Sequence, residues 1–462
     1  MLEKIFPENN QRVINQKQND ITVIIGNPPY SAKQENSNDN NQNLKYQKLD
    51  EKIANSYAKY STATNKSSLY DSYIRAIRWA SDRIKDKGIV CFVTNGSFLD
   101  SNSADGLRKC LVDNFTSIYY FNLRGNGRTS GETCRKEGHP LFAALGGKGG
   151  SLAPIAITVL IKNPDKKQET KLFYHDIGDY LKRSEKLDII KGFGDVSTIP
   201  WSEITPNDNY DWINQRNDDF ESFISLGDKK DATTRTIFDI SSNGLQTNRD
   251  SWAYNFSNSL IFYNMKRMIE FYNSQLNENE INHDPKYISW TRGLKTRLIK
   301  KEKLDLDLQC MRIAIYRPYC KEWLYFSKYF NEYLYQMPKI FPNQNLENLA
   351  ICVTGIGATK EFSALITNTI PNLHFHDTSQ CFPLYTYEKQ SELGSLFATA
   401  TTEQYTKKEN IPDSILKDFQ KKYQDKTITK TDIFYYIYGV LHSPEYKQRF
   451  AADLKKMLPR IP

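Results

Sequence analysis

The sequence predicts two regions: an α/β domain of the doubly wound type over residues 1–185, and a mixed α+β region over residues 186–462. The first prediction rests on short β-branched apolar runs that alternate with segments of helical spacing. The second rests on the loss of that alternation after about residue 186, where tryptophans are spread through polar and aromatic sequence. From about residue 405 to residue 462 the pattern becomes helical again.

The elements of the first region follow one another as strand, helix, strand, helix and strand. Residues 21–25 are a β-branched apolar run that ends at Gly26, which is typical of a buried parallel strand. Residues 69–85 carry apolar side chains at helical spacing, and Gly88 ends that helix. We further expect strands at 89–93, 117–122 and 155–162, a helix at 107–114, a glycine-rich loop at 124–150, and C-terminal helices at 411–422, 432–441 and 444–458.

Composition limits the class of protein. No apolar run approaches the ~20 residues that cross a bilayer, and the polar N-terminus has no signal-peptide core, so we expect a cytoplasmic protein. The seven cysteines form no Cys-x-x-Cys pair, and His374 and His376 have no third ligand in view, so no metal site is expected. A net charge of +8 and an aromatic content of 13% are compatible with a nucleic-acid partner but do not establish one.

The tetrapeptide Asn27-Pro28-Pro29-Tyr30 directly follows the first predicted strand. It should therefore lie at the carboxyl edge of the sheet, where ligands of open α/β sheets bind. The prolines fix φ and remove backbone donors, which leaves the Asn27 side-chain oxygen and the Pro28 carbonyl as acceptors for an exocyclic amine. Tyr30 offers a flat face on which a base extruded from the duplex can stack. A plain turn at a strand end is the alternative, and the strand and the aromatic residue favour the functional interpretation.

Asn-Pro-Pro-Tyr resembles the signature of amino-methyltransferases that use S-adenosylmethionine. The resemblance extends to the type ISP enzymes, the single-polypeptide restriction-modification proteins, through the sequence around residues 27–85 and through residues 122–126, 247–252, 316–319, 434–442 and 458–462. It implies a DNA adenine-N6 methyltransferase whose catalytic residues are Asn27, Pro28, Pro29 and Tyr30 and whose methyl donor is S-adenosylmethionine. It also implies that the substrate is double-stranded DNA with a flipped adenine, and that the C-terminal region recognises the target.

One departure from the family concerns the cofactor. In the family, a helicase-nuclease and then the first cofactor-binding strands with a Gly-x-Gly loop precede Asn-Pro-Pro-Tyr, whereas only 26 residues precede it here. We therefore expect residues 1–185 to be the C-terminal half of a Rossmann-like class I methyltransferase domain, and an upstream helicase-nuclease or S-adenosylmethionine-binding polypeptide to be its partner. A permuted domain is the alternative, because residues 351–353 look like a strand running into Gly355-x-Gly357; a lone Gly-x-Gly is, however, a weak signal.

Basic residues set among aromatic residues and glycines are the candidates for DNA contact in the second region. They are Arg249, Arg292, Lys295, Arg297 and Arg317. For any one of them, a solvated surface position or an internal ion pair is an equal alternative. Three functions stay open: methyl transfer with DNA specificity, a non-catalytic recognition subunit or fragment that needs an upstream polypeptide, and methylation of a non-DNA amide. The large second region favours the first over the third.

Overall fold

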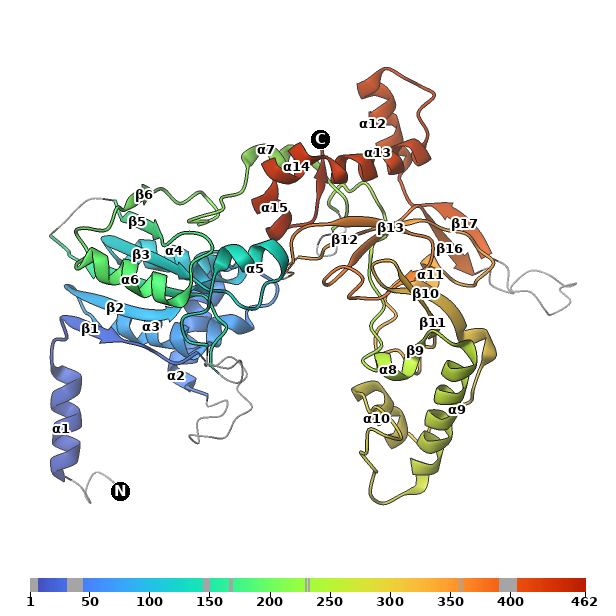
Figure 1. Ribbon diagram of the computed structural model, residues 1–462, viewed down its shortest axis with the longest axis horizontal. Coiled ribbons are helices and arrows are strands. Elements are labelled where there is room, and N and C mark those ends of the chain that lie inside the picture. Colours follow the sequence, from blue (N-terminus) through green and yellow to red (C-terminus); the bar gives the residue numbers. More distant parts are fainter. Residues whose placement is uncertain are drawn as a thin grey trace, which may run out of the picture. The chain divides into compact units, whose positions relative to one another are not determined.

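The computed structural model describes residues 7–30, 45–143, 150–165, 169–228, 231, 233–356, 358, 360–389 and 405–462. The chain forms two compact units, Met1–Gln215 and Arg216–Pro462 (Figure 1). The boundary therefore differs from the one expected after residue 185, which falls inside helix α6 (Arg183–Phe193). The reason is that Ile189, Ile190 and Phe193 of this helix pack against a hydrophobic cluster of unit 1.

Unit 1 contains a six-stranded sheet with the order β1-β2-β4-β3-β5-β6. Its strands are β1 (Val23–Gly26), β2 (Gly88–Asn95), β3 (Ser117–Arg124), β4 (Ile155–Lys162), β5 (Lys171–Asp176) and β6 (Ser202–Ile204). Its α-helices are α1 (Pro7–Gln18), α2 (Gln47–Ile53), α3 (Ser72–Arg83), α4 (Asp105–Asn114), α5 (Gly131–Glu137) and α6. A π-helix at Ala54–Ala58 continues α2, and single 3-10 turns occupy Ser67–Tyr70, Gly96–Leu99 and Asn102–Ala104.

Strand direction places the candidate catalytic residues. β1 pairs in parallel with β2, and β3 pairs in parallel with β5, whereas β4 lies between β2 and β3 and is antiparallel to both. Consequently β1, β2, β3 and β5 run in one direction and their carboxyl ends meet at one edge of the sheet. The four strands expected from the sequence are confirmed. The expected order of strand, helix, strand, helix and strand is also confirmed, by β1, α3, β2, α4 and β3. The sequence did not predict that β4 is inserted antiparallel, nor that α5, β5 and β6 exist.

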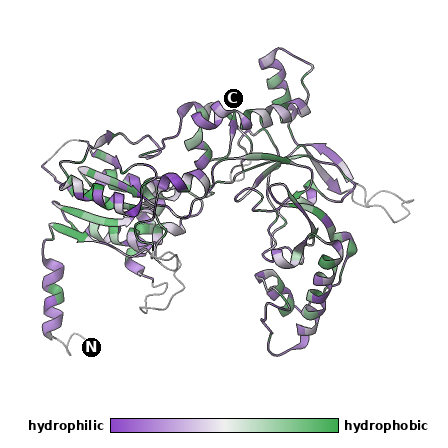
Figure 2. Cartoon of the chain, in the orientation of Figure 1, coloured by the Kyte–Doolittle hydropathy of each residue, from purple (hydrophilic) through white to green (hydrophobic). Residues whose placement is uncertain are grey.

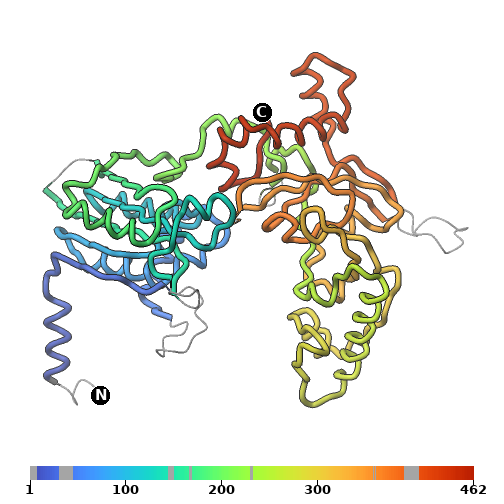
Figure 3. The backbone as a smooth tube through the Cα atoms, viewed as in Figure 1, coloured from blue at the N-terminus to red at the C-terminus, as the bar shows by residue number. Residues whose placement is uncertain are grey.

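One edge of the sheet is β1, which pairs only with β2 among the described strands. Figure 2 shows hydrophobic strands in this unit and a mainly hydrophilic α1, and α1 extends away from the sheet (Figure 3). Val23 is 54% exposed, Ile25 is 76% exposed, and Ile89, the register partner of Val23, is 39% exposed. Parallel strands of doubly wound domains are normally covered on both faces, so this face is unusually bare.

Unit 2 is built around two small sheets, with orders β14-β10-β11-β9 and β13-β12-β15-β8, and two strand pairs, β16-β17 and β18-β7. The strands are β7 (Ile224–Ser225), β8 (Ser242–Asn243), β9 (Tyr254–Asn255), β10 (Met311–Arg317), β11 (Cys320–Tyr325), β12 (Ala350–Val353), β13 (Ala364–Thr367), β14 (Ile370–Pro371), β15 (Gln380–Pro383), β16 (Tyr385–Lys389), β17 (Tyr405–Glu409) and β18 (Arg460–Ile461). This composition agrees with the expected mixed α+β region.

The helices of unit 2 form two groups. The first comprises α7 (Asp218–Ser222), α8 (Asp250–Ala253), α9 (Asn258–Ser274), α10 (Arg292–Ile299) and α11 (Met337–Ile340), with 3-10 turns at Gln275–Asn277 and Leu308–Cys310. The second comprises α12 (Asp413–Tyr423), α13 (Lys430–His442), α14 (Pro444–Arg449) and α15 (Ala451–Lys456). The expected helical C-terminus is confirmed, although its last helix is two helices separated at Phe450. No helix within the described ranges is long and apolar enough to cross a membrane.

Candidate active site and DNA-recognition surface

The tetrapeptide Asn27-Pro28-Pro29-Tyr30 follows β1 directly and lies at the edge where the parallel strands end. Asn27 and Pro29 are exposed, and Pro28 and Tyr30 are half-buried. The sequence folds this way because the apolar run ends at Gly26, whose position beside Phe92 of β2 leaves little space for a side chain: an added Cβ would lie 3.3 Å from the ring. The expected position of the motif at the carboxyl edge of the sheet is thus observed.

Tyr30 links the motif to the core. Its ring meets Tyr73 of α3 edge to face, with centroids 6.3 Å apart and an interplanar angle of 86°. Its hydroxyl donates to the Asn27 Oδ1 at 3.4 Å, and burial raises the pKa of this phenol. The long hydrogen bond leaves the second lone pair of the Asn27 oxygen for another donor. An anchored ring therefore lies beside an exposed amide acceptor.

A polar network occupies the same sheet edge, at the ends of β3 and β5. The Arg124 Nε lies 2.6 Å from the Asp176 Oδ1, and its Nη1 pairs with Asp179. Asn122 Nδ2 donates to Asp176 Oδ2 at 3.2 Å, and Tyr174 Oη donates to the same oxygen at 2.7 Å. Burial alone would raise the pKa of Asp176, but the bonds from Tyr174 and Arg124 outweigh it and lower that pKa. In the sequence, residues 122–126 stand out only by their resemblance to the family, which assigns them no role, and Asp176 does not stand out because β5 is not expected.

Lys186 of α6 is a buried cation near this network. Its side chain is fully buried, and its Nζ donates to the Glu137 carbonyl oxygen at 2.9 Å. Burial lowers the pKa of Lys186 to about 8. Gly125, at φ 87°, passes close by, since an added Cβ would lie 3.4 Å from Nζ and 3.0 Å from the Pro140 Cα. Lys186 thus holds the segments that follow β3 together.

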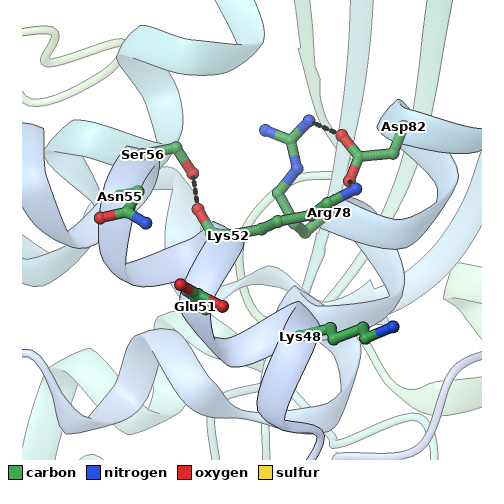
Figure 4. A pocket seen from close by; sticks show the side chains of 7 residues that line it. All are labelled: Lys48, Glu51, Lys52, Asn55, Ser56, Arg78 and Asp82. Atoms are coloured by element: carbon green, nitrogen blue, oxygen red, sulfur yellow. Dashed lines mark hydrogen bonds and ion pairs between the residues drawn. The ribbon is translucent and has the colours of Figure 1, made fainter.

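A polar pocket of about 550 Å³ lies elsewhere in unit 1, on α2, the π-helix and α3 (Figure 4). Arg78 and Lys52 both pair with Asp82, the latter at 2.8 Å between Nζ and Oδ2. Its lining residues are Lys48, Glu51, Lys52, Asn55, Ser56, Arg78 and Asp82, and none belongs to the tetrapeptide. Because Lys52 and Arg78 already pair with Asp82, we interpret the pocket as a solvated surface of ion pairs and not as a ligand site.

The segment considered as a permuted cofactor loop has a different geometry. The expected strand exists as β12, but it pairs antiparallel with β13 and β15. Gly355 is packed against Thr378, whose carbonyl oxygen would lie 2.1 Å from an added Cβ. Gly357 lies outside the described residues. Among the described residues, the next element after β12 is the antiparallel strand β13 and not a crossover helix, which does not fit the βα turn of a dinucleotide-type site.

The five basic residues considered for DNA contact have different environments. Arg292 and Lys295 are exposed on α10, whereas its Leu294 and Leu298 are buried. Arg297 is half-buried, pairs with Glu302 at 2.7 Å between Nη1 and Oε2, and lies over the Tyr329 ring. Arg317 lies over the Tyr316 ring, donates to Asn372 Oδ1 at 3.0 Å and has Asp250 within 3.8 Å.

Arg249 differs from the other four because it is only 3% exposed. Its Nη1 donates to the Phe330 carbonyl oxygen at 2.9 Å and its Nη2 to the Thr291 Oγ1 at 2.6 Å. Burial lowers the pKa of Arg249 to about 10. In this structure its guanidinium is enclosed, so Arg249 has the internal environment that was the alternative to a DNA contact. The sequence did not reveal this, since a cation among aromatic residues has the same pattern whether it lies inside or outside.

No group of three or more His, Cys, Asp and Glu side chains suited to a metal ion occurs within the described part of the chain. His376 is buried, and its Nδ1 lies 2.8 Å from the Ser363 Oγ. All seven cysteines are free thiols, and Cys110, Cys352 and Cys381 are buried.

Comparison with known proteins gives matches to both units. Residues 2–126 match the family described as Eco57I restriction-modification methylase, and residues 236–462 match the type ISP C-terminal specificity domain. Among curated proteins, none matches the chain.

Three solved structures resemble nearly the whole chain. A nuclease-deletion mutant of the type ISP restriction-modification enzyme LlaGI, in complex with a DNA substrate mimic, is 39% identical with a TM-score of 0.80; the match covers 99% of this chain and 41% of that one. The ATP-dependent type ISP enzyme LlaBIII bound to DNA is 37% identical with a TM-score of 0.82, over 99% of this chain and 29% of that one. DrdV in complex with DNA is 35% identical with a TM-score of 0.82, and the match covers 98% of this chain and 44% of that one.

The chain thus spans less than half the length of each of these three proteins. Its methylase match falls within unit 1, which carries Asn27 and Tyr30, and its specificity match falls within unit 2. A methylase implies a methyl donor. Together these matches place the chain in the type ISP restriction-modification family, with a methylase segment followed by the C-terminal specificity domain.

Proposed function

We propose that the chain provides the methyl-acceptor side of a DNA adenine-N6 methyltransferase site and the domain that recognises the DNA target. One observation carries the catalytic part of this proposal. The exposed Asn27 amide, at the carboxyl edge of the sheet, lies next to the ring of Tyr30, which is anchored on Tyr73. This arrangement suits a flipped base, because the ring supplies a stacking face and the amide supplies an acceptor for the base's amino group.

The residues of the motif divide the work of the reaction. S-adenosylmethionine, when bound, supplies an electrophilic methyl group on a sulfonium. The Asn27 Oδ1 and the Pro28 carbonyl accept the two hydrogens of the adenine amine, so that its lone pair is directed away from the ring toward the methyl group. Positive charge that develops on the amine nitrogen during its methylation would be stabilised by these two acceptors. The surplus proton then leaves to water.

The residues that bind the methyl donor are not assigned within the described ranges. The face of β1 and β2 that carries Val23, Ile25 and Ile89 is exposed, although parallel strands of this fold are normally covered on both faces. We propose that the donor-binding strands and their helices belong to a polypeptide segment that adds to β1 and covers this face. The same observation supports a second candidate function, a DNA-recognition subunit whose active site is completed in trans.

Substitution of Asn27 tests the catalytic role. In an assembly that methylates DNA, Asn27→Ala should lower the single-turnover methylation rate by orders of magnitude and leave DNA affinity within about twofold, because the lost acceptor acts mainly on the amine being alkylated. Asn19→Ala is the matched control, since it removes an exposed asparagine amide of the same unit outside the tetrapeptide. Full activity of Asn27→Ala would exclude this active site.

A further inference from the structure

Three segments of unit 2 meet at a composite surface: residues 246–250, 291–300 and 330–335. The buried Arg249 joins them, because it donates to the Thr291 hydroxyl and to the Phe330 carbonyl oxygen. Gln246 and Tyr333 exchange two backbone hydrogen bonds, of 3.1 Å and 3.0 Å. The side chain of the buried Arg249 and the backbone bridge between Gln246 and Tyr333 therefore fix the relative positions of the three segments.

Amide and aromatic groups dominate one part of this surface. The Gln246 Nε2 donates to the Asn248 Oδ1 at 2.8 Å, and the Tyr335 hydroxyl donates to the Gln246 Oε1 at 3.3 Å. Asn248 is exposed, and within the described residues its amide nitrogen has no acceptor. The rings of Tyr333 and Tyr335 stack with centroids 5.7 Å apart and are 47% and 40% exposed. The network thus orients one amide and leaves its two N–H donors open to a ligand.

Cations dominate the adjoining part. A pocket of about 310 Å³ is lined by Arg292, Gly293, Thr296, Arg297, Lys300, Glu302, Glu332 and Tyr333. Arg292 and Lys300 are exposed, whereas the charge of Arg297 is offset by Glu302. The Glu332 carboxylate accepts from the Gly293 backbone N–H at 3.2 Å and caps the start of α10. Two open cations therefore lie beside the amide and aromatic groups.

Backbone conformation supports a functional role for the surface. Asn248 has φ 55° and Tyr335 has φ 48°, in the left-handed region. Asparagine tolerates this region, but a tyrosine there costs of order 1–3 kcal/mol and is retained only where the surroundings fix it. Such strained residues cluster at ligand-binding sites. Here the strain places Tyr335 where its hydroxyl reaches the Gln246 amide.

We propose that this surface, formed by Gln246, Asn248, Tyr333, Tyr335, Arg292 and Lys300, is where unit 2 contacts duplex DNA, and that Asn248 is a residue that determines sequence specificity. Side-chain amides recognise base edges, above all adenine, whereas Arg and Lys next to them neutralise phosphates. An acidic peptide would use the cations but would have no need of the oriented amide. The inference rests on the proposed DNA-recognition function and specifies which residues perform it.

The test separates base contact from phosphate contact. The purified chain, Asn248→Gly, Arg292→Ala and Lys421→Ala are each used to select duplexes from a library with a randomised centre, and binding to the selected and to a scrambled duplex is measured across a salt series. Glycine keeps the left-handed φ of Asn248 and removes only the amide. Lys421, on α12, is an exposed cation outside the three segments and serves as the matched control.

We expect Asn248→Gly to relax one position of the selected sequence, to lose about tenfold in preference for the wild-type sequence, and to keep the salt slope. Arg292→Ala should weaken binding to both duplexes and reduce the slope of log affinity against log salt by about 0.9. An unchanged consensus and preference for Asn248→Gly, or an unchanged slope for Arg292→Ala, would overturn the assignment of this surface. If the wild-type chain selects no sequence and binds no duplex at low salt, the proposed recognition function itself fails, and this inference with it.

Discussion

The guanidinium of Arg249 donates a 2.6 Å hydrogen bond to the hydroxyl of Thr291, the residue that caps helix α10. The same hydroxyl accepts from the Leu294 backbone N–H at 3.4 Å. A buried cation is thus attached to the first turn of the helix that presents Arg292 and Lys295 to solvent. The Nε of Arg249 is buried with no hydrogen-bond partner among the described residues. The bonds from its Nη1 to Phe330 and from its Nη2 to Thr291 must therefore offset the cost of burying this group.

We therefore expect Arg249→Met to destabilise unit 2. The substitution leaves the Phe330 carbonyl without its donor and the Thr291 hydroxyl with only the Leu294 N–H, and a buried polar group left unsatisfied costs about 1–3 kcal/mol. Hydrogen exchange of the α10 backbone amides should accelerate, and the lower stability should shift the unfolding midpoint to a lower urea concentration. Arg292→Met on the exposed face of the same helix is the control and should change stability by less than about 0.5 kcal/mol. Equal protection of α10 in both variants would contradict this role of Arg249.

Two substitutions of Tyr30 should separate its ring from its hydroxyl. Tyr30→Phe removes only the 3.4 Å hydrogen bond to Asn27 and should change the methylation rate of an active assembly by less than about threefold. Tyr30→Ala removes the stacking face, which is worth about 1–3 kcal/mol per base, and should lower the rate by tenfold or more. The measurement is single-turnover methyl transfer to duplex DNA. A larger effect from Tyr30→Phe than from Tyr30→Ala would mean that the hydroxyl acts in the reaction.

The sequence predicted those parts of the fold that are local. Four strands of unit 1 were recognisable because each carries a continuous β-branched or aromatic run, and the catalytic tetrapeptide because its four residues are adjacent. β5 was missed because Lys171–Asp176 has a charged residue at each end and no β-branched residue, and α5 because it lies inside a glycine-rich stretch. That β4 would insert antiparallel between β2 and β3 depends on pairing between distant segments, which a local pattern does not contain.

The site divides in the same way. Arg124 and Asp176 come together from positions 52 residues apart, so their network could not be inferred from spacing. Among the basic residues, Arg292 and Lys295 have the exposure expected of DNA contacts, whereas Arg249 is enclosed. Arg249 is enclosed because it bonds to Thr291 and Phe330, and neither residue is close to Arg249 in the sequence.

Stability should fall in mildly acidic solution because of His376. Burial lowers the pKa of this imidazole from 6.5 to about 4, with Lys360 adding to the effect. Between these values the unfolded chain binds a proton that the folded chain does not, so stability decreases as the pH falls from 6.5 toward 4, by on the order of 3 kcal/mol in all. The difference in unfolding free energy between His376→Gln and wild type, measured across this range, isolates the effect. A difference that is independent of pH would show that His376 is protonated equally in both states.

The exposed face of β1 leads to the last prediction. Ile25 is 76% exposed, so Ile25→Asp should cost the isolated chain little stability, whereas Ile24→Asp, which places a charge against the core of unit 1, should destabilise it by several kcal/mol.

If donor-binding strands add to β1, the isolated wild-type chain should bind S-adenosylmethionine weakly and methylate little, because its donor site is incomplete. When the complementing segment is added, the wild-type chain should regain donor binding and methyl transfer. The Ile25→Asp variant should regain neither, since its carboxylate would be buried at the new interface without a partner. Calorimetry with S-adenosylmethionine and methyl incorporation into mixed-sequence DNA measure the two steps. Micromolar donor binding with turnover by the isolated chain would show that the described units already contain the donor site.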